Sequence, residues 1–363
     1  MRSPFAGRRV LVTGHTGFKG AWLVLWLREL GAEVSGYALP PATTPSLYIE
    51  ARIRELMHAE ALADVGDARA VHEFVQRTQP EVVFHLAAQA IVRRGYREPV
   101  ETWRTNVMGV AHLLEAVRAT PSVRVCQIIT SDKCYENPGR VCAFRESDPM
   151  GGHDPYSASK GAAEIAVAAW RRSYFAGDDS ASIASARAGN VIGGGDWADD
   201  RIIPDCIRAL ERHQPIAVRN PQAVRPWQHV LEPLAGYLRL AERQLEDGPA
   251  FADAFNFGPA PTGVQTVGDV VDRVVEHWGG GRWEHRPSAS DVEPRGRTHE
   301  AAFLTLDITK ASTLLGWRPI YSLDEAVAET VQWYRRRHSE SDRFDARAAC
   351  CEQIARYRQR QPR

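Results

Sequence analysis

The sequence has no long hydrophobic run and no excess of charge of either sign. Its longest apolar stretch near the start, Ala21 to Leu27, is far shorter than the roughly 20 residues that a membrane-spanning helix needs. Lysine plus arginine total 45, and so do aspartate plus glutamate, so the formal net charge is zero. We therefore expect no membrane span and no general attraction to nucleic acid, which leaves a small molecule as the expected partner.

Cysteine is scarce, and the six cysteines lack the spacing typical of metal ligands. The adjacent Cys350 and Cys351 cannot readily pair with each other, so we interpret all six as reduced thiols and expect no metal. The first residues lead directly into Val10 to Val12 without a hydrophobic leader, which predicts a cytoplasmic protein.

Short apolar runs alternate with segments of helical periodicity, which predicts strand–helix–strand units around a parallel sheet. At ~150 residues per domain, the 363 residues suffice for about two domains. The predicted strands are Arg9 to Thr13, Glu33 to Tyr37, Val82 to His85, Val125 to Thr130, Ser182 to Arg187 and a returning strand at 255–258. The predicted helices are Phe18 to Leu30, Asp67 to Gln76, Val100 to Ala119, Pro155 to Tyr174 and a solvated terminal helix within Tyr334 to Arg363.

Three evenly spaced glycines follow the first predicted strand, at the start of a helix. Without Cβ atoms they permit a tight turn and a close backbone approach to a pyrophosphate, whose charge the helix N-terminus stabilises. A purely structural turn is the alternative, because the spacing differs from the common Gly-x-Gly-x-x-Gly pattern. The context favours dinucleotide binding by Gly14, Thr16, Gly17, Phe18, Lys19 and Gly20.

Two further segments strengthen the prediction of a dinucleotide site. Asp64 and Val65 end a short apolar step where an adenine could be held. A strand end with small residues, where bulk would obstruct a cofactor, is formed by Leu86, Ala87, Ala88 and Gln89. The end of the second strand, Gly36 to Leu39, carries neither the acid expected for a ribose 2′-hydroxyl nor an arginine for a 2′-phosphate. Of the two nicotinamide cofactors, we predict NAD.

Tyr156 and Lys160 lie four residues apart at the start of a predicted helix and therefore share one helix face. A phenol is a poor base at neutral pH unless a nearby ammonium favours the phenolate, and Lys160 can supply that charge. An ordinary surface pair is the alternative, but the glycine-rich turn upstream favours catalysis.

Ser131, Asp132 and Lys133 follow a strand directly, at the end where open α/β sheets place their ligands. A turn with solvated charges would look similar in sequence. Their closeness to the Tyr156 chemistry favours roles as acid, base or proton relay.

These residues together resemble the extended short-chain dehydrogenase/reductase family, in its nucleotide-sugar branch, over nearly the whole chain. The resemblance also rests on Asn106 and on the strings RAGNVIG (187–193), RPWQHV (225–230) and LGWRP (315–319). Within that branch, the chain resembles the CDP-glucose 4,6-dehydratases through three strings: GHTGFKG (14–20), SDKCYEN (131–137) and DPMGGHDPY (148–156).

The resemblance implies that CDP-glucose is oxidised at C4 by NAD, loses water across C5 and C6, and regains the hydride at C6. Tyr156 would take the proton of the 4-hydroxyl, and Ser131 would bond the same oxygen. Asp132 would be the acid at the 6-hydroxyl and the next residue, Lys133, the base at C5. The product would be CDP-4-dehydro-6-deoxy-glucose, a precursor of O-antigen-type surface sugars.

Several assignments stay open within that resemblance. The dTDP-glucose enzymes carry glutamate where this chain has Lys133, and a lysine accepts a proton only when it is neutral. Family logic places Asn106 and Lys160 at the cofactor and Asn190 and Arg225 near the substrate diphosphate. Arg201 and His299 are further candidates for substrate binding that could equally be structural. The choice of CDP rests on the strings alone.

We expect a Rossmann-like, doubly wound α/β domain with a smaller C-terminal substrate-binding lobe. The predicted division gives residues 1–189 and 222–258 to the NAD domain, 190–221 and 259–345 to the lobe, and 346–363 to a helical tail. Family resemblance also implies a homo-oligomer, dimer or tetramer, packed through the helices predicted at 100–119 and 155–174.

Three rival functions remain. A nucleotide-sugar 4-epimerase shares the cofactor and the Tyr–Lys pair but has no need of Asp132 and Lys133. A 4,6-dehydratase for another nucleotide-linked hexose would use the same residues. A cofactor-sensing binding protein is disfavoured, because Tyr156 and Lys160 are both present.

Overall fold

The protein is built around one seven-stranded sheet in which every pairing is parallel. The computed structural model describes residues 3–139, 142–177, 179–260, 265–286 and 303–361. In spatial order the strands are β10 (Ala254–Phe257), β6 (Ser182–Ala188), β5 (Val125–Ile129), β4 (Val82–His85), β1 (Arg9–Thr13), β2 (Glu33–Ala38) and β3 (Ala59–Leu62). This order confirms the doubly wound sheet and the return of the chain beside β6. The order changes direction between β1 and β4, and ligands of such sheets bind there at the carboxyl ends of the strands.

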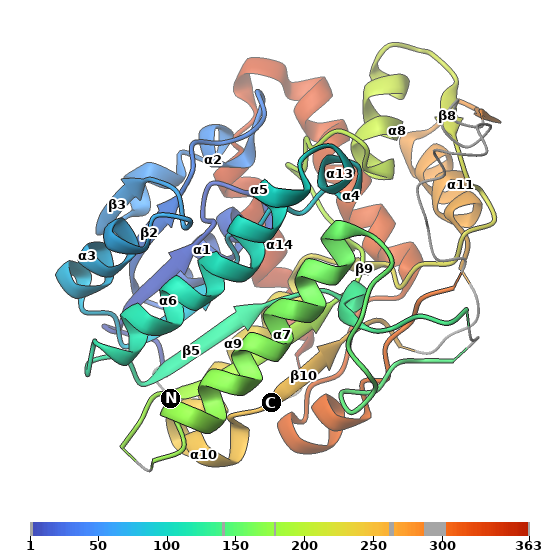
Figure 1. Cartoon of the computed structure of the whole chain (residues 1–363). Helices are drawn as coiled ribbons and strands as arrows, with labels where there is room; N and C mark the ends of the chain where they lie inside the picture. Colours follow the sequence, from blue (N-terminus) through green and yellow to red (C-terminus); the bar gives the residue numbers. More distant parts are fainter. Residues whose placement is uncertain (1–2, 140–141, 178, 261–264, 287–302, 362–363) are drawn as a thin grey trace.

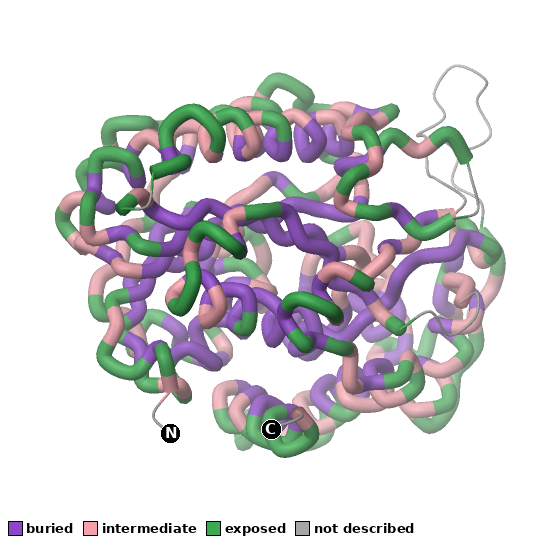
Figure 2. Tube along the Cα trace, turned by 90° about the horizontal axis from the view of Figure 1, so that it is seen from below, coloured by how far each residue is buried: buried purple, intermediate pink, exposed green. Residues whose placement is uncertain are grey.

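Helices cover both faces of this sheet (Figure 1). One face packs against α3 (Ala68–Thr78), α6 (Gly109–Arg118) and α7 (Pro155–Tyr174). The other packs against α1 (Phe18–Glu29) and α9 (Leu231–Glu246), behind which lie α13 (Leu323–Glu340) and α14 (Ala346–Arg360). The buried trace runs through the middle of the molecule, and exposed residues gather on the helices around it (Figure 2). Burial on both faces explains why β1, β4 and β5 are mostly apolar rather than alternating, whereas β6 is buried throughout although it carries Ser182, Ser185 and Arg187.

The smaller elements lie outside the seven-stranded sheet. Two short parallel pairs join β7 (Val191–Ile192) to β9 (Gln228–His229) and β8 (Ile216–Val218) to β11 (Trp283–His285). The remaining helices and turns are α2 (Leu47–Glu50), η1 (Ile53–Leu56), α4 (Val92–Arg97), α5 (Pro99–Trp103), η2 (Arg104–Met108), η3 (Asp132–Cys134), α8 (Ile202–Glu211), α10 (Gly248–Phe251), α11 (Val267–Trp278), η4 (Ala311–Leu315) and η5 (Ser341–Arg343).

The C-terminal helix is part of the core, so the expectation of a solvated terminal helix is wrong. Tyr357 and Ile354 of α14 are buried, and the Tyr357 ring meets Trp26 of α1 edge-on at 5.7 Å. Helix α1 is therefore covered on both sides, which explains why all of Ala21 to Leu27 is buried. Of the helices described, none combines the length and apolarity required to cross a bilayer.

The helix predicted over residues 100–119 is interrupted. Helix α5 passes into a π-helical turn, η2, before α6 begins. Asn106 lies in that turn with its side chain buried and directed at neighbouring loops, and π-turns of this kind commonly mark functional positions. Gly109 follows because a Cβ there would come within 2.9 Å of the Val65 side chain.

Glu232, at the start of α9, joins three segments of the chain. Its carboxylate accepts hydrogen bonds from the backbone N–H groups of Ile320 (2.9 Å) and Tyr321 (2.7 Å) and from the Tyr357 hydroxyl (2.6 Å). Burial raises the pKa of Glu232 to about 7, although these three donors favour the ionised form. The unfolded chain would ionise this carboxyl near the ordinary glutamate pKa of ~4.3.

We expect Glu232→Gln to flatten the pH dependence of stability. Because the folded-state pKa is raised, the stability that the neutral carboxyl contributes is present below the unfolded pKa and is lost as pH rises toward 7. From pH 5 to pH 8, the wild-type free energy of unfolding should fall relative to that of the variant by about 2 kcal/mol. Urea unfolding at both pH values measures this, and parallel changes in the two proteins would contradict it.

Candidate active site

The glycine loop between β1 and α1 is shaped by close backbone contacts. Gly14 has φ +75°, and a Cβ there would lie 2.7 Å from the Ala87 backbone nitrogen. A Cβ on Gly20 would collide with the Gly14 carbonyl oxygen. Gly17 caps α1 without a side-chain hydrogen bond, and the first turn carries no acid. The loop thus fits the pyrophosphate of a dinucleotide, whose charge the N-terminus of α1 would stabilise.

The other residues predicted in this loop lie at its two sides. The Thr16 hydroxyl donates to the Leu39 carbonyl at 2.8 Å and fixes the loop to the end of β2. The Lys19 amine donates to the Tyr237 hydroxyl at 3.3 Å. Burial lowers the pKa of Lys19 to about 7, and the positive charges of Arg201 and Lys160 lower it as well. Through Lys19 the glycine loop therefore reaches two of the residues predicted to be catalytic, Asp132 and Lys160.

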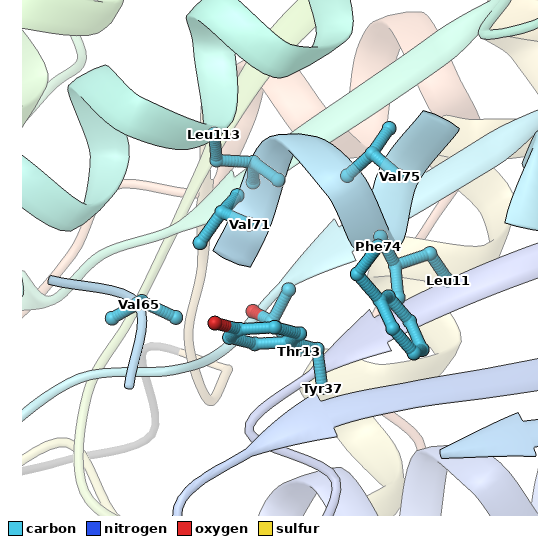
Figure 3. A pocket seen from close by; sticks show the side chains of 8 residues that line it. All are labelled: Leu11, Thr13, Tyr37, Val65, Val71, Phe74, Val75 and Leu113. Atoms are coloured by element: carbon cyan, nitrogen blue, oxygen red, sulfur yellow. The ribbon is translucent and has the colours of Figure 1, made fainter. Parts of the chain in front are cut away.

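The loop that carries Asp64 and Val65 is held by Tyr37 at the end of β2. The Tyr37 hydroxyl donates to the Asp64 carbonyl at 2.9 Å, and the Asp64 carboxylate binds the Gly66 N–H at 2.7 Å and the Arg104 guanidinium. Figure 3 shows the Tyr37 ring with its hydroxyl on the side of Val65. The pocket drawn there is apolar and lined by Leu11, Thr13, Tyr37, Val65, Val71, Phe74, Val75 and Leu113. Tyr37 thus holds the loop of Asp64. It lies near the end of β2, where dinucleotide-binding sheets commonly carry an acid that binds the ribose.

An acid near this strand comes instead from β3, which the sequence analysis did not predict. Glu60 accepts from the Tyr48 hydroxyl at 2.7 Å and pairs with His15 Nε2 at 2.9 Å. The His15 ring packs over Gly36, where a Cβ would come within 2.6 Å of it. Burial lowers the pKa of His15 despite the carboxylate of Glu60. No local pattern signals this contact, because β3 is half-exposed and without strong periodicity.

Asn106 connects the end of β4 to the catalytic helix. Its amide oxygen accepts from the Gln89 N–H at 2.9 Å, and its amide nitrogen donates to the Gln89 carbonyl at 3.0 Å and to Ser159 Oγ at 2.9 Å. Through these bonds Asn106 acts as a positioning residue. They hold the segment 86–89 beside Gly14.

Helix α7 presents Tyr156 and Lys160 on its buried face, as predicted. Asp154 caps the helix by accepting from the N–H groups of Tyr156 (2.9 Å) and Ser157 (3.0 Å), and Pro155 occupies the first turn. The Tyr156 phenol hydrogen-bonds with Ser131 at the end of β5. Tyr156 on α7 and Ser131 after β5, two members of the predicted catalytic set that are distant in sequence, thereby lie together.

Burial dominates the electrostatics of this pair. It raises the pKa of Tyr156 to about 12, although the Ser131 hydrogen bond and the Arg201 charge act in the opposite direction. It also lowers the pKa of Lys160 to about 8, against the attraction of Glu164. The phenol is therefore neutral at pH 7, and the expected stabilisation of a phenolate by Lys160 is outweighed by desolvation.

Asp132 is a buried acid, and one of its two carboxylate oxygens has no hydrogen-bond partner among the described residues. Its Oδ1 accepts from Ser131 Oγ at 2.9 Å, whereas its Oδ2 is buried and has no partner among the described residues. Burial raises the pKa of Asp132, against the charges of Lys133 and Arg225. A carboxyl held toward its protonated form, with a free oxygen, is suited to donate a proton. The Lys133 side chain, half-buried, makes no hydrogen bond within the described chain.

Two of the predicted substrate residues, Arg201 and Arg225, lie close enough to Tyr156 and Asp132, respectively, to affect their pKa values. Asn190 joins β6 to β7, and its carbonyl accepts from the Gln228 N–H at 3.0 Å. The Arg225 side chain donates to the Val224 carbonyl at 2.8 Å and lies close enough to Asp132 to affect its pKa. Arg201 pairs with Asp196 at 3.0 Å. His299 lies outside the described residues.

A buried ion pair beneath the catalytic helix was also missed. Glu164, one turn after Lys160, pairs with Arg187 of β6 at 2.7 Å. The same carboxylate accepts from Thr130 and, at 2.7 Å, from Ser185. No sequence pattern indicates this ion pair, because Glu164 resembles any other acidic residue on a helix. Its partners lie on or directly after two strands of the sheet.

The six cysteines are all free. Within the described parts of the chain, no three histidine, cysteine, aspartate or glutamate side chains are grouped so as to hold a metal ion.

This fold and site define a dinucleotide-binding α/β protein with a buried Tyr–Lys pair and a buried carboxylic acid at the switch point of its sheet. A model of the family described as GDP-mannose 4,6 dehydratase matches residues 11–330. The chain belongs to this family.

Individual relatives narrow the comparison. A CDP-glucose 4,6-dehydratase of Salmonella typhimurium is 46% identical over 333 residues, which cover 91% of each chain. A UDP-glucose 4-epimerase of Thermotoga maritima, solved with UDP-glucose, has a similar structure with TM-score 0.76 and 24% identity over 90% of this chain and 99% of the other. A dTDP-glucose 4,6-dehydratase of Bacillus anthracis, solved with NAD, has TM-score 0.74 and 20% identity over 92% and 98%. The two solved structures confirm the fold.

Proposed function

We propose that the chain converts CDP-glucose into CDP-4-dehydro-6-deoxy-glucose and water, with NAD as its cofactor. The observation that carries this proposal is the buried Asp132, whose free oxygen lies beside the Ser131–Tyr156 pair. An epimerase needs no such acid, because it removes no hydroxyl group. The identity shared with the Salmonella typhimurium dehydratase supports the choice of a CDP-linked sugar.

The residues at the end of β5 and on α7 would divide the work as follows. Gly14, Gly17 and Gly20 would hold NAD at the N-terminus of α1, and the bound cofactor would supply the hydride acceptor for C4 and the hydride donor for C6. Tyr156 takes the proton of the sugar 4-hydroxyl, and Ser131 orients that oxygen through the hydrogen bond it now makes with the phenol. Asp132 donates its proton to the departing 6-hydroxyl, and Lys133 in its neutral form is the proposed base at C5.

The cofactor and substrate would lie against opposite sides of these groups. The glycine loop fits a dinucleotide, because its tight turn at the N-terminus of α1 leaves no room for Cβ atoms, which would collide with the backbone of Ala87 or Gly14. For the sugar nucleotide we propose Asn190, Arg201 and Arg225, since a guanidinium matches the geometry of phosphate oxygens. Residues 190–221 and 259–345 would then form the lobe that covers the substrate.

We also propose a homo-oligomer formed through α5, η2 and α7. Large apolar side chains stand exposed along these elements, with 80% of Val100 accessible. The others are Trp103, Met108, Ile165 and Tyr174. Such side chains gathered on adjoining helices are typical of an interface. Light scattering measures the mass in solution.

The test of the function is to incubate the protein with NAD and, separately, CDP-, dTDP-, UDP- and GDP-linked glucose, and to measure product mass. We expect CDP-glucose alone to lose the mass of one water without net accumulation of reduced cofactor. An unchanged mass with conversion at C4 would mean an epimerase. Dehydration of another nucleotide sugar would overturn the choice of CDP.

Asp132→Asn should slow dehydration by about 100-fold, because an amide cannot donate the proton that the 6-hydroxyl needs. Oxidation at C4 does not use this proton, so the nicotinamide absorbance should still report reduced cofactor when CDP-glucose is added. Asp148→Asn, ahead of α7, is the control and should leave both steps intact. Equal loss of both steps in Asp132→Asn would contradict the assigned role.

A further inference from the structure

The pair formed by Asp196 and Arg201 precedes helix α8. Arg201 Nη1 donates to Asp196 Oδ2 at 3.0 Å, and the other carboxylate oxygen accepts from the Ala198 N–H at 3.1 Å. The Asp196 side chain is 6% exposed, whereas that of Arg201 is 36% exposed. One end of the ion pair is therefore fixed in the protein, and the other reaches solvent.

The backbone that carries Asp196 is held from two sides. The Trp22 indole of α1 donates to the Gly194 carbonyl at 2.9 Å, and the Tyr334 hydroxyl of α13 donates to the Asp196 carbonyl at 2.6 Å. Gly195, with φ +81°, packs so closely on Leu47 of α2 that a Cβ would come within 2.8 Å of it. Contacts with three helices leave the loop little freedom.

The next residue closes the loop against the cofactor half of the molecule. The Trp197 indole donates to Glu50 of α2 at 3.1 Å, and the Arg337 guanidinium lies over the Trp197 ring while pairing with Glu50 at 2.6 Å. These contacts fix Trp197 more firmly than an ordinary exposed loop requires. These contacts hold the loop, and with it Asp196, in a fixed position.

This loop presents the guanidinium of Arg201, some of whose N–H groups have no partner among the described residues. Among the described residues, the Arg201 side chain makes no hydrogen bond other than the one to Asp196. It lies close enough to Tyr156 and Lys19 to lower the pKa of each by its charge. Lys160 also lies near Lys19, so three basic side chains are gathered here, an arrangement that suits an anion although Asp132 acts on Lys19 in the opposite direction.

We propose that Asp196 is a positioning residue that pins one edge of Arg201 so that its other N–H groups face the diphosphate of the sugar nucleotide. This proposal rests on the proposed function. A guanidinium binds phosphate best through two parallel N–H groups, and fixing its orientation beforehand removes the side-chain entropy that binding would otherwise cost.

The experiment measures CDP and cytidine binding by calorimetry in wild type, Asp196→Ala, Arg201→Ala and the double variant. We expect Asp196→Ala to weaken CDP binding by roughly tenfold, because Arg201 loses the charged hydrogen bond that orients it, and to leave the affinity for cytidine, which has no phosphate, unchanged. The double variant should bind CDP like Arg201→Ala alone, because Asp196 acts through Arg201. Asp199→Ala is the matched control, with the same charge change in the same loop at a side chain 93% exposed.

Each outcome separates the possibilities. A further loss of CDP affinity in the double variant, or an equal loss for cytidine, would make Asp196 merely structural and overturn the proposal. An effect of Asp199→Ala as large as that of Asp196→Ala would also overturn it, because net charge alone would then explain the loss. If the wild type binds no CDP at all, the proposed function itself fails.

Discussion

Tyr156→Phe should reduce dehydration of CDP-glucose by about 10³-fold, because general base catalysis of this kind contributes ~10²–10⁴-fold. The change removes only the phenol oxygen, which hydrogen-bonds with Ser131 and is the group proposed to take the 4-hydroxyl proton. The ring itself stays buried, so the fold should be retained. Product mass over time, together with NAD affinity by calorimetry, measures the effect.

The control is Tyr174→Phe, at the exposed end of the same helix α7. It should leave both the rate and the affinity for NAD unchanged. The expected pattern for Tyr156→Phe is a loss of the first redox step as well as the second, so no reduced cofactor should form when CDP-glucose is added. Unchanged dehydration would remove Tyr156 from the chemistry and leave the buried pair with a structural role.

The parts of the fold that were predictable are those encoded by local patterns. The predicted strand Arg9 to Thr13 and the predicted helix Pro155 to Tyr174 agree with the structure residue for residue. Each is a continuous segment whose burial or capping depends on its own residues: the apolar run of β1 and the Asp154–Pro155 start of α7. The resemblance to the family likewise depends on short strings, and the 46% identity to a curated relative confirms it.

The features that no sequence pattern indicates depend on contacts between distant segments. Glu60 meets His15 only because β3 lies beside β2, and α14 is buried only because α1 offers it an apolar outer face. Lys160 was expected to favour the phenolate of Tyr156, yet the degree of burial, which no motif encodes, decides the pKa of both groups. Spacing brings charged residues together, but it does not say how much water surrounds them.

Breaking the buried pair between Glu164 and Arg187 should be the most destabilising single change in the catalytic region. Arg187→Met leaves the carboxylate of Glu164 buried with only the hydroxyls of Thr130 and Ser185, and removing one partner of such a pair costs about 3–5 kcal/mol. Burial alone would raise the pKa of Glu164, and Arg187 is the main reason why it is lowered instead. The stability that this pair contributes is therefore present above the ordinary glutamate pKa and lost as pH falls through the lowered value. Urea unfolding at pH 7 measures the cost.

The double variant Glu164→Met with Arg187→Met tests whether that cost comes from charge or from packing. Replacing both partners by apolar side chains removes the unpaired charge, so the double variant should be more stable than Arg187→Met alone. Its activity should nevertheless fall, because Glu164 lies one turn from Lys160 and its charge holds the pKa of that amine above the value that burial alone would give. Recovered stability with lost activity would show that the pair serves the catalytic lysine more than the fold. A double variant less stable than Arg187→Met would instead mean that shape complementarity, rather than charge, makes this pair necessary.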